Sequence, residues 1–242
     1  MTLAILALGA LSGGVVTGLA GFGTGLTALG IWLYVVTPVQ AAVLVVVCSV
    51  VGQAVSLFTV RRAFAWRRAW PFLVGGLLGV PLGVGALSAV EPRALKAFLG
   101  LLLVGYTGLS LGLRRVPTIA AGGRIADGVV GFGGGALGGV AGLSGPLPTI
   151  WCGLRGWSAD AQRSVYQPYN LTILAVVLCL YLAQGLVTRE VAGFLLVCLP
   201  GTVLGAALGV RLYGRVNDRQ FRTLVLALLL VSGLVLAFSN LR

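Results

Sequence analysis

Long runs of apolar residues recur along the whole chain, with short polar stretches between them. Six runs come close to the roughly 20 residues that a helix needs to cross the hydrocarbon core of a bilayer: Ala41–Val60, Ala69–Val90, Leu95–Leu113, Leu171–Val187, Val191–Val210 and Leu224–Phe238. The runs do not alternate apolar and polar positions as β-barrel strands do, so they predict helices. The pattern therefore predicts an all-α integral membrane protein.

The chain also contains an internal repeat. Gly13–Leu26 aligns without gaps on Gly134–Leu147, and two later blocks align in the same order. These later pairs are Gly75–Gly83 with Gly201–Gly209, and Val90–Lys96 with Val216–Arg222. Three ordered matches indicate a duplication.

The repeat predicts two homologous halves and about eight membrane segments. Each half consists of a Gly-rich broken or re-entrant segment followed by three transmembrane helices. We expect residues 1–115 to form the first membrane repeat, 116–123 a linker and 124–242 the second repeat.

Composition agrees with a membrane protein. Hydrophobic residues make up 58% of the chain and charged residues only 9%, too few to cover the surface of a soluble domain. The net charge of +12 would suggest nucleic-acid binding in a soluble protein, but here the arginines lie in short loops between apolar runs. We therefore expect a lipid bilayer and no nucleic acid as partner. The first residues lack a basic region and a cleavage site, so we expect no removable signal peptide.

The basic residues discriminate between two topologies. If all eight segments cross fully, nine lie inside and eight outside, which is no bias. If the Gly-rich segments are re-entrant and the N-terminus is outside, four lie outside (Arg93, Lys96, Arg189 and Arg242) and thirteen lie inside: Arg61, Arg62, Arg67, Arg68, Arg114, Arg115, Arg124, Arg155, Arg163, Arg211, Arg215, Arg219 and Arg222. Insertion normally produces such a bias. Three full spans per half then make the halves inverted repeats, each beginning with two half-helices, while a plain eight-span topology stays open.

The cores of the Gly-rich segments are the candidate substrate site. Dense glycine disfavours a helix interior, and Pro146 and Pro148 favour a break or a new helix start. A break exposes unpaired N–H groups, and a helix N-terminus attracts anions. We predict an oxyanion between the two breaks, bound by Gly21, Phe22, Gly23, Thr24 and Gly25 of the first half and by Gly142, Leu143, Ser144, Gly145 and Pro146 of the second. The alternative is that glycines only allow close helix crossing, which we favour for Gly75, Gly79, Gly83, Gly201, Gly205 and Gly209.

Polar residues in the following spans are further candidates. Gln53, Gln167 and Asn170 either hold helices together or line the substrate pathway, and both interpretations stay open. For Arg163 we expect either a vestibule that attracts anions or an anchor in the lipid headgroups.

Other chemistry is disfavoured. The chain has no histidine, and its single lysine is Lys96, so serine or cysteine catalysis has no evident base. The residues for a transition-metal or haem site are missing as well. We expect no enzyme, no metal and no cofactor, and we expect the four cysteines to pack as small hydrophobic residues.

The paired segments, the length and the layout of the chain resemble the sulfite exporter TauE/SafE family. Its signature is a G-x-G-G-G run followed by apolar residues and a proline, once in each half. Here the copies read Gly21-Phe-Gly-Thr-Gly25 and Gly142-Leu-Ser-Gly-Pro146, so Thr24 and Ser144 stand within the glycine runs. The resemblance implies a permease that moves sulfite, organosulfonates or related oxyanions out across the bacterial inner membrane.

Three function classes follow. The first is a secondary transporter with a small anionic substrate, the second an anion channel of the same fold, and the third a membrane assembly protein without transport activity. A homo-oligomer is compatible with all three.

Overall fold

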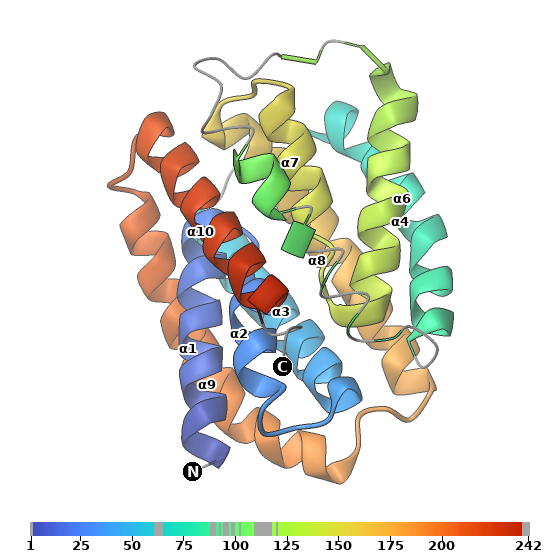
Figure 1. Ribbon diagram of the computed structural model, residues 1–242, viewed down its shortest axis with the longest axis vertical. Coiled ribbons are helices and arrows are strands. Elements are labelled where there is room, and N and C mark those ends of the chain that lie inside the picture. The colour runs from blue at the N-terminus through green and yellow to red at the C-terminus, as the bar shows by residue number, and fades with distance from the viewer. Residues whose placement is uncertain are drawn as a thin grey trace.

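Every element that the structure describes is a helix (Figure 1). The computed structural model describes residues 2–60, 65–87, 91, 93, 97, 100–101, 103–108, 118–119 and 121–238. The helices are α1 Thr2–Ala20, α2 Thr24–Trp32, α3 Pro38–Val60, α4 Trp66–Ala86, α6 Gly123–Ala141, α7 Pro146–Leu154, α8 Ala159–Ala183, α9 Arg189–Tyr213 and α10 Asp218–Phe238. Within the described part of the chain, α1, α3, α4, α8 and α9 are long and apolar enough to cross a membrane.

The long helices agree with the predicted spans, with one large difference. Helix α8 begins at Ala159, twelve residues before the predicted run at Leu171, because Ser158 caps the helix and its hydroxyl accepts a hydrogen bond from Ala161 N. The first three turns are polar, so an apolar pattern could not reveal them. Most of the predicted span Leu95–Leu113 and part of the predicted linker 116–123 lie outside the described residues.

Both Gly-rich segments form antiparallel helical hairpins. In the first, the Trp32 indole at the end of α2 donates to Leu6 O near the start of α1, at 3.1 Å. In the second, Arg155 just after α7 donates to Gly123 O at the start of α6, at 3.0 Å. The prediction of two half-helices per hairpin was wrong for the first arms, which have 19 residues each, whereas the second arms have 9.

Glycines join the first arm of each hairpin to a long helix of the other half. Helix α1 packs along α9, and α6 packs along α4. A Cβ atom on Gly79 would lie 2.1 Å from Phe132 O, and one on Gly205 would lie 2.3 Å from Leu11 O. The interpretation of the Gly75 to Gly83 and Gly201 to Gly209 stripes as close helix crossings is confirmed. At five of the six glycines an added Cβ would lie 1.9 to 2.3 Å from a backbone oxygen of the neighbouring helix, and at Gly201 it would lie 3.3 Å from Ala10 Cβ.

The outer surface of the long helices is apolar. Leu78 and Leu82 on α4, and Leu204 and Leu208 on α9, expose between 49% and 66% of their surface. Large exposed apolar faces on full-length helices are typical of contact with lipid. The protein is therefore a multi-pass membrane protein.

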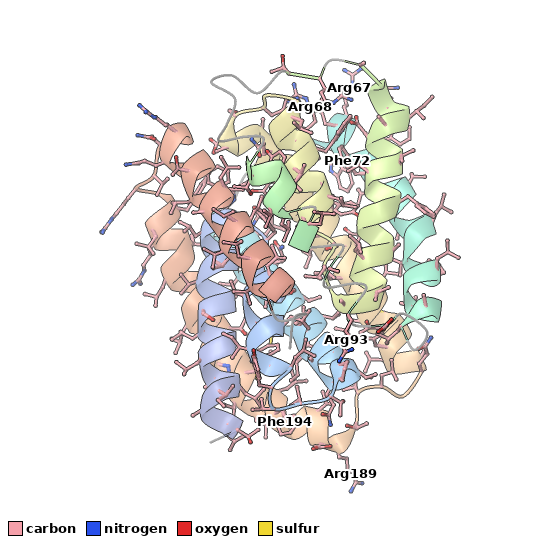
Figure 2. All side chains as sticks on the ribbon, viewed as in Figure 1. Arg67, Arg68, Phe72, Arg93, Arg189 and Phe194 are labelled. Atoms are coloured by element: carbon pink, nitrogen blue, oxygen red, sulfur yellow. The ribbon has the colours of Figure 1, made fainter. Side chains whose placement is uncertain are left out.

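Arginines lie toward both ends of the molecule. Arg67 and Arg68 lie near one end, whereas Arg93 lies in the other half and Arg189 at the far end (Figure 2). In the same view, the N-terminus lies toward the end of the molecule that carries Arg189 (Figures 1 and 2).

Candidate functional site

The first helix break consists of Gly21, Phe22 and Gly23, between α1 and α2. Gly21 and Gly23 have positive φ angles of 81° and 113°, a region that L side chains rarely adopt. A Cβ atom on Gly23 would also lie 2.7 Å from Val16 Cγ1. The glycine pattern in the sequence therefore corresponds to a real interruption of the helix.

A buried arginine satisfies part of the carbonyl end of α1. The Arg163 side chain is fully buried and donates to Leu19 O at 2.9 Å and to Gly18 O at 3.1 Å. It also donates to Ser56 Oγ at 2.9 Å and lies over the Tyr213 ring. Both expectations for Arg163, an open vestibule and a lipid anchor, were wrong, because its charge stabilises the negative end of a helix instead.

The other two terminal carbonyls of α1 are satisfied by side chains from α8 and α3. The Tyr166 hydroxyl donates to Ala20 O at 2.5 Å, and Gln53 Nε2 donates to Gly21 O at 2.8 Å. All four orphan carbonyls at this helix end therefore have a donor, so the break can persist in a dry interior.

On the other side of the break, the first turn of α2 presents N–H groups. Thr24 N donates to Thr17 Oγ1 at 3.0 Å, and the two threonine hydroxyls lie 2.6 Å apart. The next N–H groups, of Gly25 and Leu26, have no intrahelical acceptor because of their position in the first turn. They are the donors expected at an anion site.

The second break is stabilised mainly by its own backbone. Gly142, at a φ of 68°, donates from its N–H to Gly138 O at 2.8 Å, a common left-handed helix end. Helix α7 then begins with Pro146, and Pro148 follows two residues later. Because proline has no N–H, Leu147 is the only one of these first three residues with a donor.

Ser144 of the second break forms a hydrogen bond with a side chain of α8. Its hydroxyl donates to Asn170 Oδ1 at 2.9 Å, and both residues are 1% exposed. Asn170 Nδ2 has no hydrogen-bond partner within the described part of the chain, and the same is true of Gln53 Oε1.

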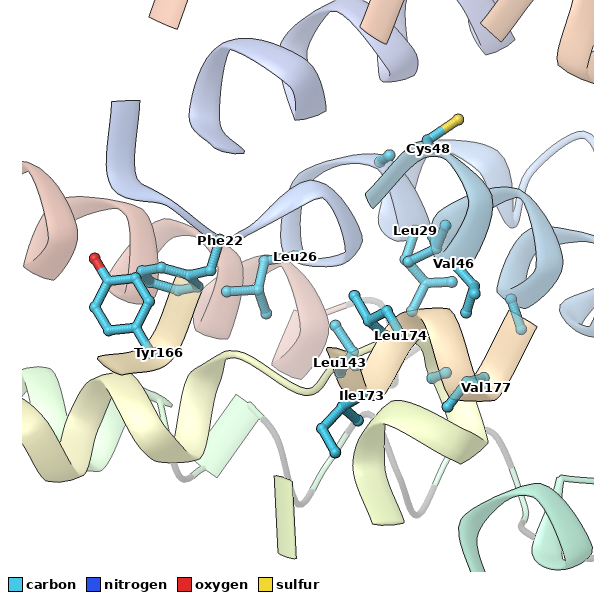
Figure 3. Packing of buried hydrophobic residues seen from close by; sticks show 14 of the residues in the cluster. Phe22, Leu26, Leu29, Val46, Cys48, Leu143, Tyr166, Ile173, Leu174 and Val177 are labelled. Carbon is cyan, nitrogen blue, oxygen red and sulfur yellow. The ribbon is translucent and has the colours of Figure 1, made fainter. Parts of the chain in front are cut away.

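The two breaks meet tip to tip. A Cβ atom on Gly25 would lie 2.7 Å from Leu143 Cδ2, and one on Gly145 would lie 2.8 Å from Phe22 Cβ. Phe22 packs edge-on against Tyr166, with ring centroids 5.7 Å apart (Figure 3). The hairpins thus approach each other from different sides of the bundle.

A small cavity of about 20 Å³ lies where the tips meet. It is lined by Thr17, Phe22, Gly23, Gly25, Leu26, Ser49, Gln53, Gly142, Leu143, Ser144, Gly145, Pro146, Asn170 and Leu174. Ser49 is near the middle of α3 and Asn170 near the middle of α8, so the cavity lies at mid-height of both helices. Its volume is about that of one water molecule.

Ten of the thirteen predicted site residues line this cavity, and three do not: Gly21, Thr24 and Gln167. Gln167 donates to Ser56 Oγ at 2.8 Å and accepts from Arg163 Nε at 3.4 Å, so it orients the arginine. Gly21 is part of the backbone of the first break, and the Thr24 hydroxyl pairs with that of Thr17.

Sequence reasoning missed Thr17, Leu26, Ser49 and Leu174 among the lining residues. Thr17 lies one helical turn before Gly21, and this spacing could have identified it. Nothing in the pattern singles out the two leucines, which look like every other apolar position.

The cavity has no ionised lining. None of the described residues that line it carries a charge. The described part of the chain also has no group of three or more His, Cys, Asp or Glu side chains that could hold a metal ion. Any anion here would be bound by helix N–H groups, hydroxyls and amides.

Comparisons with known proteins agree with this arrangement. The family model "Sulfite exporter TauE/SafE" matches residues 5–236, nearly the whole chain. Searches of curated proteins and of solved structures return no match. The match includes both hairpins, the long helices and the cavity between them, and so the chain belongs to the sulfite exporter TauE/SafE family, a family of membrane transporters.

Proposed function

We propose that the protein is a secondary transporter that exports small sulfur oxyanions, sulfite or organosulfonates, across the bacterial inner membrane. The central observation is the cavity between the two helix breaks. Its wall includes the first turn of α2 and Asn170, whose Nδ2 has no partner among the described residues. In this proposal the oxyanion accepts hydrogen bonds from Asn170 and from the N–H groups of Gly25 and Leu26.

We also propose that the two halves are inverted repeats and that both hairpins are re-entrant. Helix α1, which begins the first half, packs along α9 of the second half, and α6, which begins the second half, packs along α4 of the first. Such reciprocal pairing is expected of inverted repeats. The first hairpin begins and ends near one end of the bundle, since Trp32 contacts Leu6. The second does the same, since Arg155 contacts Gly123. The position of Arg67 and Arg68 opposite Arg189 agrees with an N-terminus outside.

Topology has a direct test. A reporter domain fused after Trp157 is expected in the cytoplasm if the hairpins are re-entrant. A plain eight-span topology with the N-terminus inside requires the periplasm for the same fusion, and that result would refute the inverted arrangement.

The closed cavity favours a carrier over an open channel. Its volume of about 20 Å³ holds about one water molecule, whereas sulfite has four heavy atoms. Substrate can therefore enter only if the tips separate, as Phe22 moves from Gly145 and Leu143 moves from Gly25. Such movement of one half against the other is the usual mechanism of inverted-repeat transporters.

Flux measurements test this function. Proteoliposomes loaded with sulfite are expected to take up labelled sulfite by counterflow, with a rate that saturates as the outside concentration rises. Liposomes without protein are the control. Flux that never saturates would favour an anion channel, and no flux with sulfite or any organosulfonate would leave a non-transport role.

A further inference from the structure

The orientation of the Gln53 amide is determined by its neighbour. Nε2 donates to Gly21 O at 2.8 Å, and a backbone carbonyl can only accept. Rotating the amide by half a turn would place Oε1 against Gly21 O, and two oxygen acceptors cannot form a hydrogen bond. Oε1 is therefore held away from the carbonyl, and it is buried with no partner among the described residues. Gln53 lines the cavity, so its wall includes an unused acceptor.

Asn170, on the facing helix α8, is the complementary case. Its Oδ1 is occupied by the Ser144 hydroxyl at 2.9 Å, and its Nδ2 is unpartnered within the described chain. The wall of one cavity thus has one unused donor from α8 and one unused acceptor from α3. Buried groups of this kind are normally satisfied, so the pair indicates a ligand that brings both an acceptor and a donor.

The charges around the cavity limit the charge of that ligand. Arg163, beside the first break, has its guanidinium bound to the carbonyls of α1 and to Ser56. The tyrosines of α8 close to the breaks are also engaged, Tyr166 with Ala20 O and Tyr169 with Gly131 O. A helix N-terminus offers only about half a positive charge. The partial positive charge available at the cavity therefore suits a ligand with one negative charge better than a ligand with two.

We propose that the cavity selects oxyanions with one negative charge and a hydrogen-bond donor of their own. Among sulfur oxyanions, these are hydrogensulfite rather than the sulfite dianion, and hydroxyl-bearing sulfonates rather than plain alkanesulfonates. An S–O oxygen accepts from Asn170 Nδ2, and the O–H of the ligand donates to Gln53 Oε1. The inference rests on the proposed transport function and adds the substrate class.

The test compares two stable monoanions that differ by one hydroxyl group, 2-hydroxyethanesulfonate and ethanesulfonate. Each is added as a competitor of labelled sulfite counterflow in proteoliposomes. For the unmodified protein we expect 2-hydroxyethanesulfonate to inhibit at an about ten-fold lower concentration, since it alone satisfies Gln53 Oε1. Equal inhibition by the two sulfonates, with sulfite counterflow intact, overturns the inference and leaves the transport function standing.

The variant Gln53→Met removes the acceptor with little change in side-chain shape. The ratio between the two inhibitory concentrations is expected to fall to about one, because the ligands then differ by no protein contact. Both sulfonates are measured on the same variant, so a general loss of stability or transport rate affects both inhibitory concentrations and cancels in their ratio. Gln40→Met, on the same helix but outside the cavity, is the control and retains the ratio. An unchanged ratio in Gln53→Met overturns the inference.

A second measurement needs no variant. Sulfite changes from one to two negative charges as pH rises through neutrality, whereas ethanesulfonate stays singly charged. At constant total sulfite, the rate of counterflow is expected to fall as pH rises, in proportion to the hydrogensulfite fraction. The inhibition constant of ethanesulfonate is expected to stay the same over this pH range. Sulfite counterflow that rises with pH contradicts the inference. Absence of any sulfite counterflow overturns both this inference and the proposed function.

Discussion

The two helix breaks look alike in sequence and differ in how the fold stabilises them. The first break depends on side chains from distant segments, since Arg163, Tyr166 and Gln53 donate to the carbonyl end of α1. The second break closes mainly with its own backbone at Gly142, and the Tyr181 hydroxyl of α8 also donates to Gly139 O at 2.7 Å. Its Ser144 hydroxyl donates to Asn170 Oδ1. The first break is thus fixed by side chains of α3 and α8, whereas the second has one such anchor near its carbonyl end.

This difference suggests a division of roles. The anchored break presents the N–H groups of Gly25 and Leu26 from a constant position. The second break has fewer anchors from outside its hairpin, namely the Tyr169 and Tyr181 hydroxyls of α8 on Gly131 O and Gly139 O, so we expect it to move more readily.

Arg163→Leu is expected to cost the most stability. It leaves the carbonyls of Gly18 and Leu19 buried without their charged donor, at about 3 kcal/mol or more. Thermal unfolding in detergent, followed by tryptophan fluorescence, measures the loss. Arg189→Leu, on an exposed arginine, is the matched control. Equal melting temperatures for the two variants would show that the first break needs no anchor.

Asn170→Ala is expected to lower sulfite counterflow by about ten-fold, with protein yield and melting temperature nearly unchanged, because a donor to the substrate is lost. Ser144→Ala is expected to reduce it less, by about three-fold, since Ser144 acts by orienting Asn170. Thr223→Ala, at an exposed position on α10, is the control. Normal flux in both cavity variants would move the site elsewhere.

Gly25→Ala tests the contact between the tips. The new methyl group would lie 2.7 Å from Leu143 Cδ2, and Leu143→Ala removes that atom. In a double-mutant cycle on the free energy of unfolding, we expect a favourable coupling of about 1 kcal/mol. Additive effects would mean that the tips do not press on each other in the membrane-embedded protein.

Pro146→Ala is expected to have the smallest effect. It restores one N–H at the second break, and the concentration of sulfite at half-maximal counterflow is expected to change by less than about two-fold. In the proposed site, the second break contributes through the Ser144–Asn170 hydrogen bond rather than through its N–H groups. A change as large as that of Asn170→Ala would contradict the contrast between the breaks.

Several features of the fold could be predicted from the sequence because they depend on local chemistry. Glycines at positions 21, 23 and 142 indicate breaks since only glycine adopts their φ angles easily. The spacing of Gly75, Gly79 and Gly83 indicates a close helix crossing for the same local reason. Apolar runs give α3, α4 and α9 within a few residues.

The remaining features depend on tertiary contacts. Arg163 lies in a polar stretch that looks like a loop, and its burial follows from carbonyls more than 140 positions earlier in the chain. The length of α1 was underestimated because its glycines suggest interruption, whereas they serve the contact with α9. The identity of the unpaired amide atoms of Gln53 and Asn170 likewise requires their partners in space.

The central claim is that the anion binds between the two breaks. The most direct test is a structure of the protein loaded with selenite, the heavier analogue of sulfite, located by its anomalous signal. We expect one peak within hydrogen-bond distance of Asn170 Nδ2 and the first turn of α2, with Phe22 moved away from Gly145. A peak elsewhere, with the cavity between the breaks unoccupied, would contradict the account.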